Sequence, residues 1–209
     1  MTYKLYGRPR WGSAIVEAQL AWYGLPFAFE PVGDLFKEPD ARTRLEKVNP
    51  LAQVPTLVMP DGSVMSESAA ITLLLADLTG KDTLVPGPGA PERAKFLRWL
   101  VFLVANIYPT FTYADDPARF VAVNTARDPF RAATDGYAQK LWRQVSGAAG
   151  APWFLGERFS ALDIYTGVMS RWRPKRGWFE LETPRLFAIA RRVDQRPELA
   201  EVWKRNWPA

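Results

Sequence analysis

Residues 49–71 read NPLAQVPTLVMPDGSVMSESAAI and combine two strong local signals. The turn-forming residues 60–63 separate two short apolar runs, so 56–59 and 64–66 are predicted to form a β-hairpin. After Ser68 the apolar residues take the spacing of one helix face. They are Ile71, Leu74, Leu75 and Leu78. The stretch therefore predicts a strand, a turn, a second strand and a helix, in this order.

The same stretch carries groups that could hold a small peptide. Pro55 cannot donate to a sheet and can be cis, so the backbone of Val54 is a candidate partner for a ligand. The N–H groups at the start of the predicted helix, together with the Ser68 hydroxyl, would suit a carboxylate. Taken alone, these residues are explained more simply by an ordinary turn and an ordinary helix cap.

The order of residues in this stretch resembles the glutathione-binding half of the cytosolic glutathione transferases, whose pattern is like NPxGQVPxL…DGxxLxESxAI. Ala52 stands where that pattern usually has glycine. The matching residues are Asn49, Pro50, Gln53, Val54, Pro55, Leu57, Asp61, Gly62, Glu67, Ser68 and Ile71. The resemblance implies a bacterial member of this family whose class stays open.

The residues before this stretch predict a strand, a helix and a strand. Residues 3–6 are the first strand, a helix follows from Ser13 as N-cap to Gly24, and 27–32 form the second strand. A strand–helix–strand unit of this kind is expected to be parallel. With a short polar helix at 40–48, the order becomes βαβαββα, which resembles the thioredoxin-like domain that begins glutathione transferases.

The second half of the chain predicts helices alone. Residues 79–91 hold three Pro and three Gly and are typical of a linker. We therefore expect an α/β domain at 1–80, a linker at 81–91 and an all-α domain at 92–209. Pro109 is expected to kink or end a helix. Residues 160–163 resemble a family motif and also form a capping-box pattern, which favours a structural role.

Composition excludes several classes of chemistry. The chain has no Cys and no His, which rules out Cys–His and Ser–His nucleophiles, the usual zinc sites and a protein mixed disulfide. The net charge of +5 comes from basic residues spread among acidic ones, so no nucleic-acid partner is expected. The chain has no apolar run of about 18 residues and no apolar core of a signal peptide near its start, so we expect no membrane span and a cytoplasmic protein.

The family resemblance implies a thiol-activating group near the start of the first helix: Tyr, Ser or Cys, depending on class. Cys is absent from the chain. Counted back from Gly24 without a gap, the position of the catalytic Ser in zeta- and theta-like classes falls on Arg10, and the position of the beta-class Cys falls on Gly12. We predict Ser13 as the donor, through its hydroxyl or its backbone N–H, although a simple helix cap explains it equally well. Trp11 is predicted to form a wall of the glutathione site, and Arg10 is predicted to place a positive charge over it. Tyr6 is a weaker candidate, because a strand residue packed in the sheet explains it better.

The remaining site residues also follow from the resemblance. Ser68 and Glu67 are predicted to hold the γ-glutamyl end of glutathione. Val54 would pair through its backbone with the cysteinyl unit beside a cis Pro55, and Gln53 would reach the glycyl end. For the second substrate, the candidate pocket residues are Arg10, Asn106, Tyr108, Phe111 and Tyr113.

The sequence therefore predicts an enzyme that forms the glutathione thiolate and adds it to a small hydrophobic electrophile. Glutathione would be a co-substrate, no other cofactor or metal is expected, and the resemblance implies a homodimer. Two alternatives within enzyme chemistry are a glutathione-dependent isomerase and a peroxidase. A third alternative is a non-catalytic glutathione-binding or ligand-binding module, because a fold does not determine a function.

Overall fold

The computed structural model describes residues 2–208 of the chain. Its contacts divide the chain into two compact units. Unit 1 comprises Met1–Val85 together with Arg192–Ala209, and unit 2 comprises Pro86–Arg191. The predicted division put every residue after 91 into the helical domain. The contacts instead assign the segment from Arg192 onward to unit 1, so the chain returns to unit 1 after forming unit 2.

Unit 1 is built on a four-stranded sheet with the strand order β2-β1-β3-β4. The strands are β1 (Tyr3–Gly7), β2 (Phe27–Pro31), β3 (Thr56–Val58) and β4 (Val64–Met65). The predicted parallel pair and hairpin are both confirmed, since β1 pairs parallel with β2 and β3 pairs antiparallel with β4. The antiparallel pairing of β1 with β3 joins these two parts.

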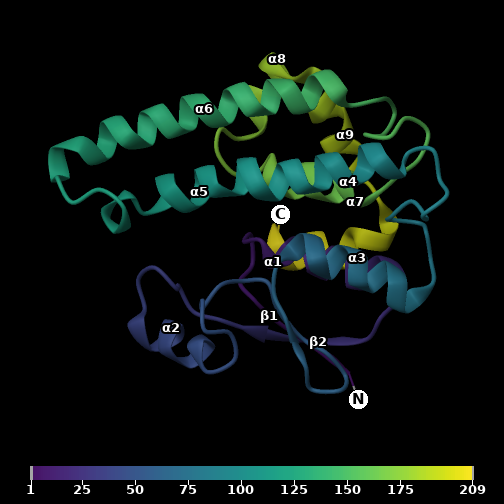
Figure 1. Cartoon of the computed structure of the whole chain (residues 1–209), viewed down its shortest axis with the longest axis horizontal. Helices are drawn as coiled ribbons and strands as arrows, with labels where there is room; N and C mark the ends of the chain where they lie inside the picture. Colours follow the sequence, from purple (N-terminus) through teal and green to yellow (C-terminus); the bar gives the residue numbers. More distant parts are fainter. Residues whose placement is uncertain (1, 209) are drawn as a thin grey trace. The chain divides into compact units, whose positions relative to one another are not determined.

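Helices cover both faces of this sheet. The helices α1 (Ser13–Tyr23) and α3 (Ser68–Thr79) pack against each other, and α1 contacts β1 (Figure 1). Tyr6 packs against buried residues of α2 (Pro39–Glu46). Because neighbouring strand residues point to opposite faces, the fully buried Leu5 faces away from α2. The helix α2 therefore lies on the face opposite α1 and α3.

The helix α1 is buried almost all round, with every residue from Ser13 to Leu20 buried. It ends as predicted at Gly24, whose φ of 69° is the left-handed conformation that glycine adopts without steric cost. Such burial requires cover on a further side, which α10 (Ala200–Asn206) supplies by packing against α1.

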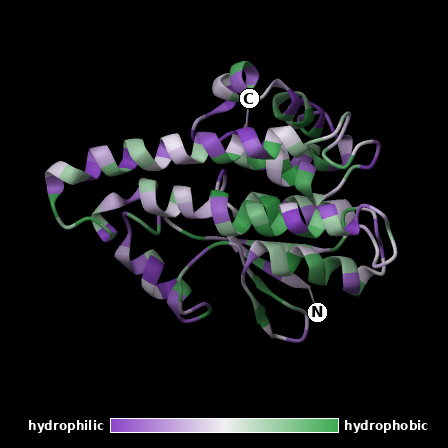
Figure 2. Ribbon diagram, turned by 45° about the horizontal axis from the view of Figure 1, so that its top comes forward, coloured by the Kyte–Doolittle hydropathy of each residue, from purple (hydrophilic) through white to green (hydrophobic). Residues whose placement is uncertain are grey.

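Unit 2 is helical. It contains α4 (Arg93–Phe102), α5 (Tyr108–Asp115), α6 (Arg127–Ala148), α7 (Ala161–Met169), α8 (Arg176–Glu182) and most of α9 (Pro184–Asp194). Short 3₁₀ turns lie at Pro117–Arg119 and Asn124–Ala126 in unit 2 and at Pro197–Leu199 in unit 1. The largest fully buried side chains of unit 2 include Trp142, Tyr165 and Phe154. Along α6, hydrophilic and hydrophobic residues alternate (Figure 2), as expected of a helix with one buried face.

Pro109 changes the helix geometry before it rather than ending the helical path. α-Helical geometry ends at Phe102, a π-helical turn spans Leu103–Ile107, and α5 begins at Tyr108. Proline has no N–H, and its ring collides with the carbonyl of the preceding turn in an α-helix. A wider π turn relieves this conflict, which accounts for its position directly before Pro109.

The helix α7 begins with the predicted capping box. The backbone N–H of Ser160 donates to Asp163 Oδ2 at 2.7 Å, and the N–H of Phe154 donates to Asp163 Oδ1 at 2.7 Å. Burial raises the pKa of the Asp163 carboxyl to about 7, against the opposing effect of these hydrogen bonds. Both carboxyl oxygens are thus occupied inside unit 2, which confirms the predicted structural role.

The variant Asp163→Asn is expected to lower the free energy of unfolding by about 2–4 kcal/mol, because one carboxyl oxygen becomes an N–H₂ group facing a donor. The pKa of Asp163 is higher in the folded than in the unfolded protein, so its contribution to stability is fully present below about pH 4 and is lost as pH rises through about 7. The difference between wild type and variant, measured by urea unfolding, should therefore shrink from pH 4 to pH 7. A difference that grows over this range would contradict the assignment.

Candidate functional site

The loop between β1 and α1 is braced by Ser13. The Ser13 hydroxyl accepts a hydrogen bond from the Arg8 N–H and donates one to the Arg8 carbonyl, both at 3.1 Å. Ser13 is fully buried, and a Cβ on Gly7 would lie 2.6 Å from its Oγ, so glycine is required there. The helix begins at Ser13 with Gly12 as N-cap, which corrects the prediction of Ser13 as the cap. A thiol that used this hydroxyl would have to displace its bond to Arg8.

The backbone at the start of α1 offers a different kind of donor. The N–H groups of Ala14 and Ile15 bond to the carbonyls of Trp11 and Gly12. Among the described residues, the N–H groups of Gly12 and Ser13 find no hydrogen-bond partner. Groups at this position point out of the helix end, where the helix dipole favours negative charge. They could stabilise an anion.

Arg10 is directed toward α10. Its N–H donates to Asn206 Oδ1 at 2.9 Å, and its Nε donates to the Asn206 carbonyl at 3.2 Å. Its φ of 71° lies in the left-handed region, which is unusual for arginine. Arg10 is thus anchored to α10, another part of unit 1, and its role beside a substrate stays a prediction.

Trp11 and Val54 meet in one apolar cluster. Together with Tyr6 they pack against buried residues that include Leu35 and Leu45. The ring of Trp11 lies 5.2 Å from the ring of Phe36, and the guanidinium of Arg8 lies 5.2 Å from the centre of the Trp11 ring. The structure thus brings together two residues that the family resemblance predicted to contact glutathione.

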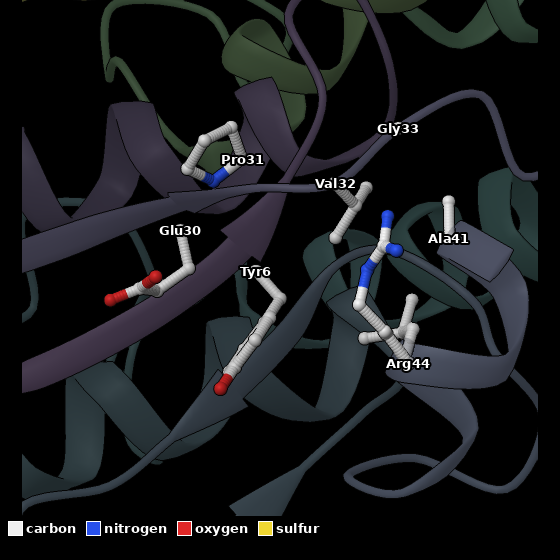
Figure 3. Close-up of a pocket in the computed structure, with 8 residues that line it drawn as sticks. Tyr6, Glu30, Pro31, Val32, Gly33, Ala41 and Arg44 are labelled. Atoms are coloured by element: carbon white, nitrogen blue, oxygen red, sulfur yellow. The ribbon is translucent and has the colours of Figure 1, made fainter.

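Tyr6 also lines a hollow beside α2. Figure 3 shows its ring between Glu30 and Arg44 in a hollow of about 180 Å³. The other lining residues are Pro31, Val32, Gly33, Ala41 and Leu45. Within the described chain, none of the residues predicted to bind glutathione lines this hollow, in agreement with a packing role for Tyr6.

The turn before β3 is fixed by side chains of its own. Asn49 Nδ2 donates to Thr56 Oγ1 at 2.9 Å, and that hydroxyl donates to the Gln53 carbonyl at 2.7 Å. The peptide bond between Val54 and Pro55 is cis, as expected. In the described part of the chain, neither the N–H nor the carbonyl of Val54 has a hydrogen-bond partner, and the side chain of Gln53 is exposed. Backbone groups of this kind are suited to pair with an extended peptide.

The start of α3 is held by α1. Glu67 precedes the helix with a φ of 63° and an exposed side chain, and Ser68 begins it. The Thr72 hydroxyl donates to the Ser68 carbonyl at 2.8 Å and accepts from Gln19 Nε2 at 2.9 Å. Non-glycine residues with positive φ cluster at functional sites. The sequence did not reveal the Gln19–Thr72 bond, since its two residues are 53 positions apart.

In unit 2, two of the predicted pocket residues form an aromatic cluster. The rings of Tyr108 and Phe111 lie 5.6 Å and 5.1 Å from the ring of Trp172, which the sequence analysis missed. Tyr113 lies apart from this cluster, exposed and stacked edge-on with Phe120 at 5.0 Å. Asn106 is half-buried in the π turn.

In the basic stretch at 171–176, Arg173 is paired with carboxylates of α5 and α6. The Arg173 guanidinium bonds to the carboxylates of Asp115 and Asp135, which contribute two negative charges. Arg176 donates to the Gly167 carbonyl at 2.8 Å. A basic surface that recognises an anion therefore receives no support from Arg173.

Comparison with known proteins identifies the family. The model described as "Glutathione S-transferase, N-terminal domain" matches residues 13–78. The uncharacterized GST-like protein YncG of Escherichia coli strain K12 is 39% identical over 204 residues, which cover 97% of this chain and 98% of that protein. The chain belongs to the glutathione S-transferase family.

Solved structures agree with this assignment. A sphingomonad glutathione S-transferase complexed with glutathione has a TM-score of 0.77 and 26% identity, covering 99% of this chain and 100% of that one. A glutathione transferase from Methylococcus capsulatus strain Bath has a TM-score of 0.75 and 27% identity, covering 97% and 98%. Within residues 2–208, no helix combines the length and the apolar character needed to cross a membrane.

The variant Thr72→Val is expected to lower the free energy of unfolding by about 1–3 kcal/mol, because it leaves the buried Gln19 amide without its acceptor. Combining it with Gln19→Leu should restore part of the loss, since replacing both partners by apolar groups is often nearly neutral. Urea unfolding of the single and double variants measures this coupling. Strictly additive losses would contradict it.

Proposed function

We propose that this protein binds glutathione in unit 1 and activates it as a thiolate that attacks a small hydrophobic electrophile. The observation that carries the proposal is the pair of N–H groups at Gly12 and Ser13, which find no partner within the described chain and lie at the positive end of α1. They follow Trp11 directly, and Trp11 packs in one cluster with Val54, the predicted partner of the cysteinyl backbone.

The chemistry requires the thiol to lose its proton near neutral pH. A free thiol has a pKa of about 8.5, and a helix N-terminus lowers this value. Each unit of pKa corresponds to about 1.4 kcal/mol of preference for the thiolate. The Ser13 hydroxyl is occupied by Arg8, so we assign the main donor role to the backbone N–H groups and keep the hydroxyl as the alternative.

The two ends of glutathione would be held elsewhere in unit 1. The γ-glutamyl carboxylate would bind the N–H groups and hydroxyl at the start of α3, at Ser68, and its ammonium would face Glu67. Gln53 is the proposed contact for the glycyl end. The sphingomonad structure, which contains glutathione, supports a site for this ligand in the family.

For the second substrate, we propose the aromatic cluster of unit 2. Phe111 is buried and packs edge-on against Trp172, so the half-buried rings of Tyr108 and Trp172 are the proposed contacts for a small hydrophobic molecule. Assembly as a homodimer stays a prediction of the resemblance, and a cytoplasmic location stays a prediction from the sequence.

A second candidate function is glutathione binding without catalysis. The bond between the Ser13 hydroxyl and the Arg8 carbonyl favours it, because it engages the hydroxyl that the sequence predicted as the thiol donor. The two functions differ in one property, the protonation state of the bound thiol.

Titration with glutathione, followed by the ultraviolet absorbance of the thiolate across pH, separates the two functions. Wild type is expected to bind glutathione with a thiol pKa at least about one unit below the free value. Ser13→Ala keeps the backbone N–H groups but removes the hydroxyl that holds Arg8, so the pKa of the bound thiol should rise by less than about one unit and stay below the free value. A return of that pKa to the free value would assign the donor role to the hydroxyl, and binding without thiolate in wild type would favour the non-catalytic function.

The variant Ser68→Ala is expected to weaken glutathione binding about tenfold or more, because a hydrogen bond to a charged carboxylate is lost. The thiol pKa should stay the same, since the carboxylate lies at the other end of the ligand. Ser66→Ala, two residues before the helix start, is the matched control. Equal affinities in the two variants would remove Ser68 from the site.

A further inference from the structure

Asn206 is a buried amide whose polar atoms are all engaged. Its Oδ1 accepts from the Arg10 N–H, and its Nδ2 donates to Glu17 Oε2 and to the Val202 carbonyl, each at 2.9 Å. Its own carbonyl accepts from Arg10 Nε at 3.2 Å. The residue is fully buried, so it joins α10 to both the loop before α1 and α1 itself.

The network sets the orientation of this amide. Glu17 accepts from the N–H₂ side of Asn206 and from Arg205, whose guanidinium lies 2.7 Å from Glu17 Oε1. The opposite orientation would place the amide oxygen against the Glu17 carboxylate and the N–H₂ group against the Arg10 N–H. Glu17 therefore directs the amide oxygen of Asn206 toward Arg10.

The loop that receives this contact is held at two points. Ser13 holds Arg8 through its hydroxyl, and Asn206 holds Arg10, whose left-handed backbone is unfavourable for arginine and needs support from its neighbours. The loop continues through Trp11 to the N–H groups of Gly12 and Ser13. A change at Arg10 is thus two residues from the first of these donors.

We infer that Asn206 is a positioning residue for glutathione activation: by holding the Arg10 amide it keeps the Gly12 and Ser13 N–H groups aimed at the sulfur. The inference rests on the proposed function. Asn206 acts through the loop and not on the ligand, so it is not a catalytic residue. A purely structural role would affect stability and leave the state of the bound thiol unchanged.

The test uses the full chain with Asn206→Ala and two measurements. Hydrogen exchange of the hydrogen-bonded amides of Arg8, Arg10 and Trp11 is followed without glutathione and is expected to accelerate at least about tenfold, since the loop loses an anchor. The pKa of bound glutathione is then measured by thiolate absorbance and is expected to rise by about one unit, which is a tenfold loss of thiolate preference.

The matched control is Asp163→Asn, which disrupts a buried hydrogen-bonded cap in unit 2. It should destabilise the protein and leave loop exchange and the thiol pKa unchanged. Unchanged loop exchange in Asn206→Ala would overturn the inference independently of any ligand. Faster exchange with an unchanged thiol pKa would also overturn it. If wild type forms no thiolate, the proposed function fails and this inference fails with it, an outcome recognised from wild type alone.

A second pair of variants keeps the test decisive if Asn206→Ala does not fold. Arg10 is exposed, so Arg10→Ala and Arg10→Lys should both fold. Both remove the Nε–H that donates to the Asn206 carbonyl, whereas only lysine keeps the positive charge. Both variants keep the backbone N–H that donates to Asn206 Oδ1, so the inference requires loop exchange and thiol pKa to change together and to the same small extent in the two variants. A perturbed Arg10→Ala beside a normal Arg10→Lys would assign the effect to charge and overturn the inference.

Discussion

A buried carboxylate on α1 constrains the arrangement of unit 1. The side chain of Glu17 is 1% exposed, and burial of a charged group costs several kcal/mol unless charge and hydrogen bonds compensate. Burial raises the pKa of Glu17, while hydrogen bonds from Asn206 and the charge of Arg205 oppose this rise. Both compensating residues come from α10. The helix α10 must therefore pack on α1, which explains why the segment from Arg192 onward belongs to unit 1.

Polar side chains along α1 connect it to the loop after β1, to α10 and to α3. Ser13 bonds to the loop after β1, Glu17 bonds to α10, and Gln19 bonds to Thr72 near the start of α3. Each bond lies among apolar residues, where an unmade hydrogen bond is costly and a made one specifies a single arrangement. The start of α1, proposed to bind the sulfur, and the start of α3, proposed to bind the carboxylate, are thus both oriented by polar side chains of α1.

Local patterns predicted the sheet, the hairpin, the helices and the capping box, because turn chemistry and apolar spacing act within about 20 residues. The 49–71 motif also predicted the cis bond before Pro55 and the residues around Val54. The roles of Ser13 and Asn206 could not be predicted, since each depends on partners set by the tertiary fold. Trp172 escaped notice for the same reason: only the fold brings it to Tyr108 and Phe111.

The return of α10 to α1 has a consequence for the order of synthesis. Domains generally fold as units, with N-terminal parts folding first while the chain is still being made. Here Glu17 is joined to Arg205 across 188 residues. While the ribosome is producing unit 2, the buried position of this carboxylate still lacks its compensating partners. The N-terminal sheet can form early, but unit 1 reaches its complete structure only after all of unit 2 has been translated.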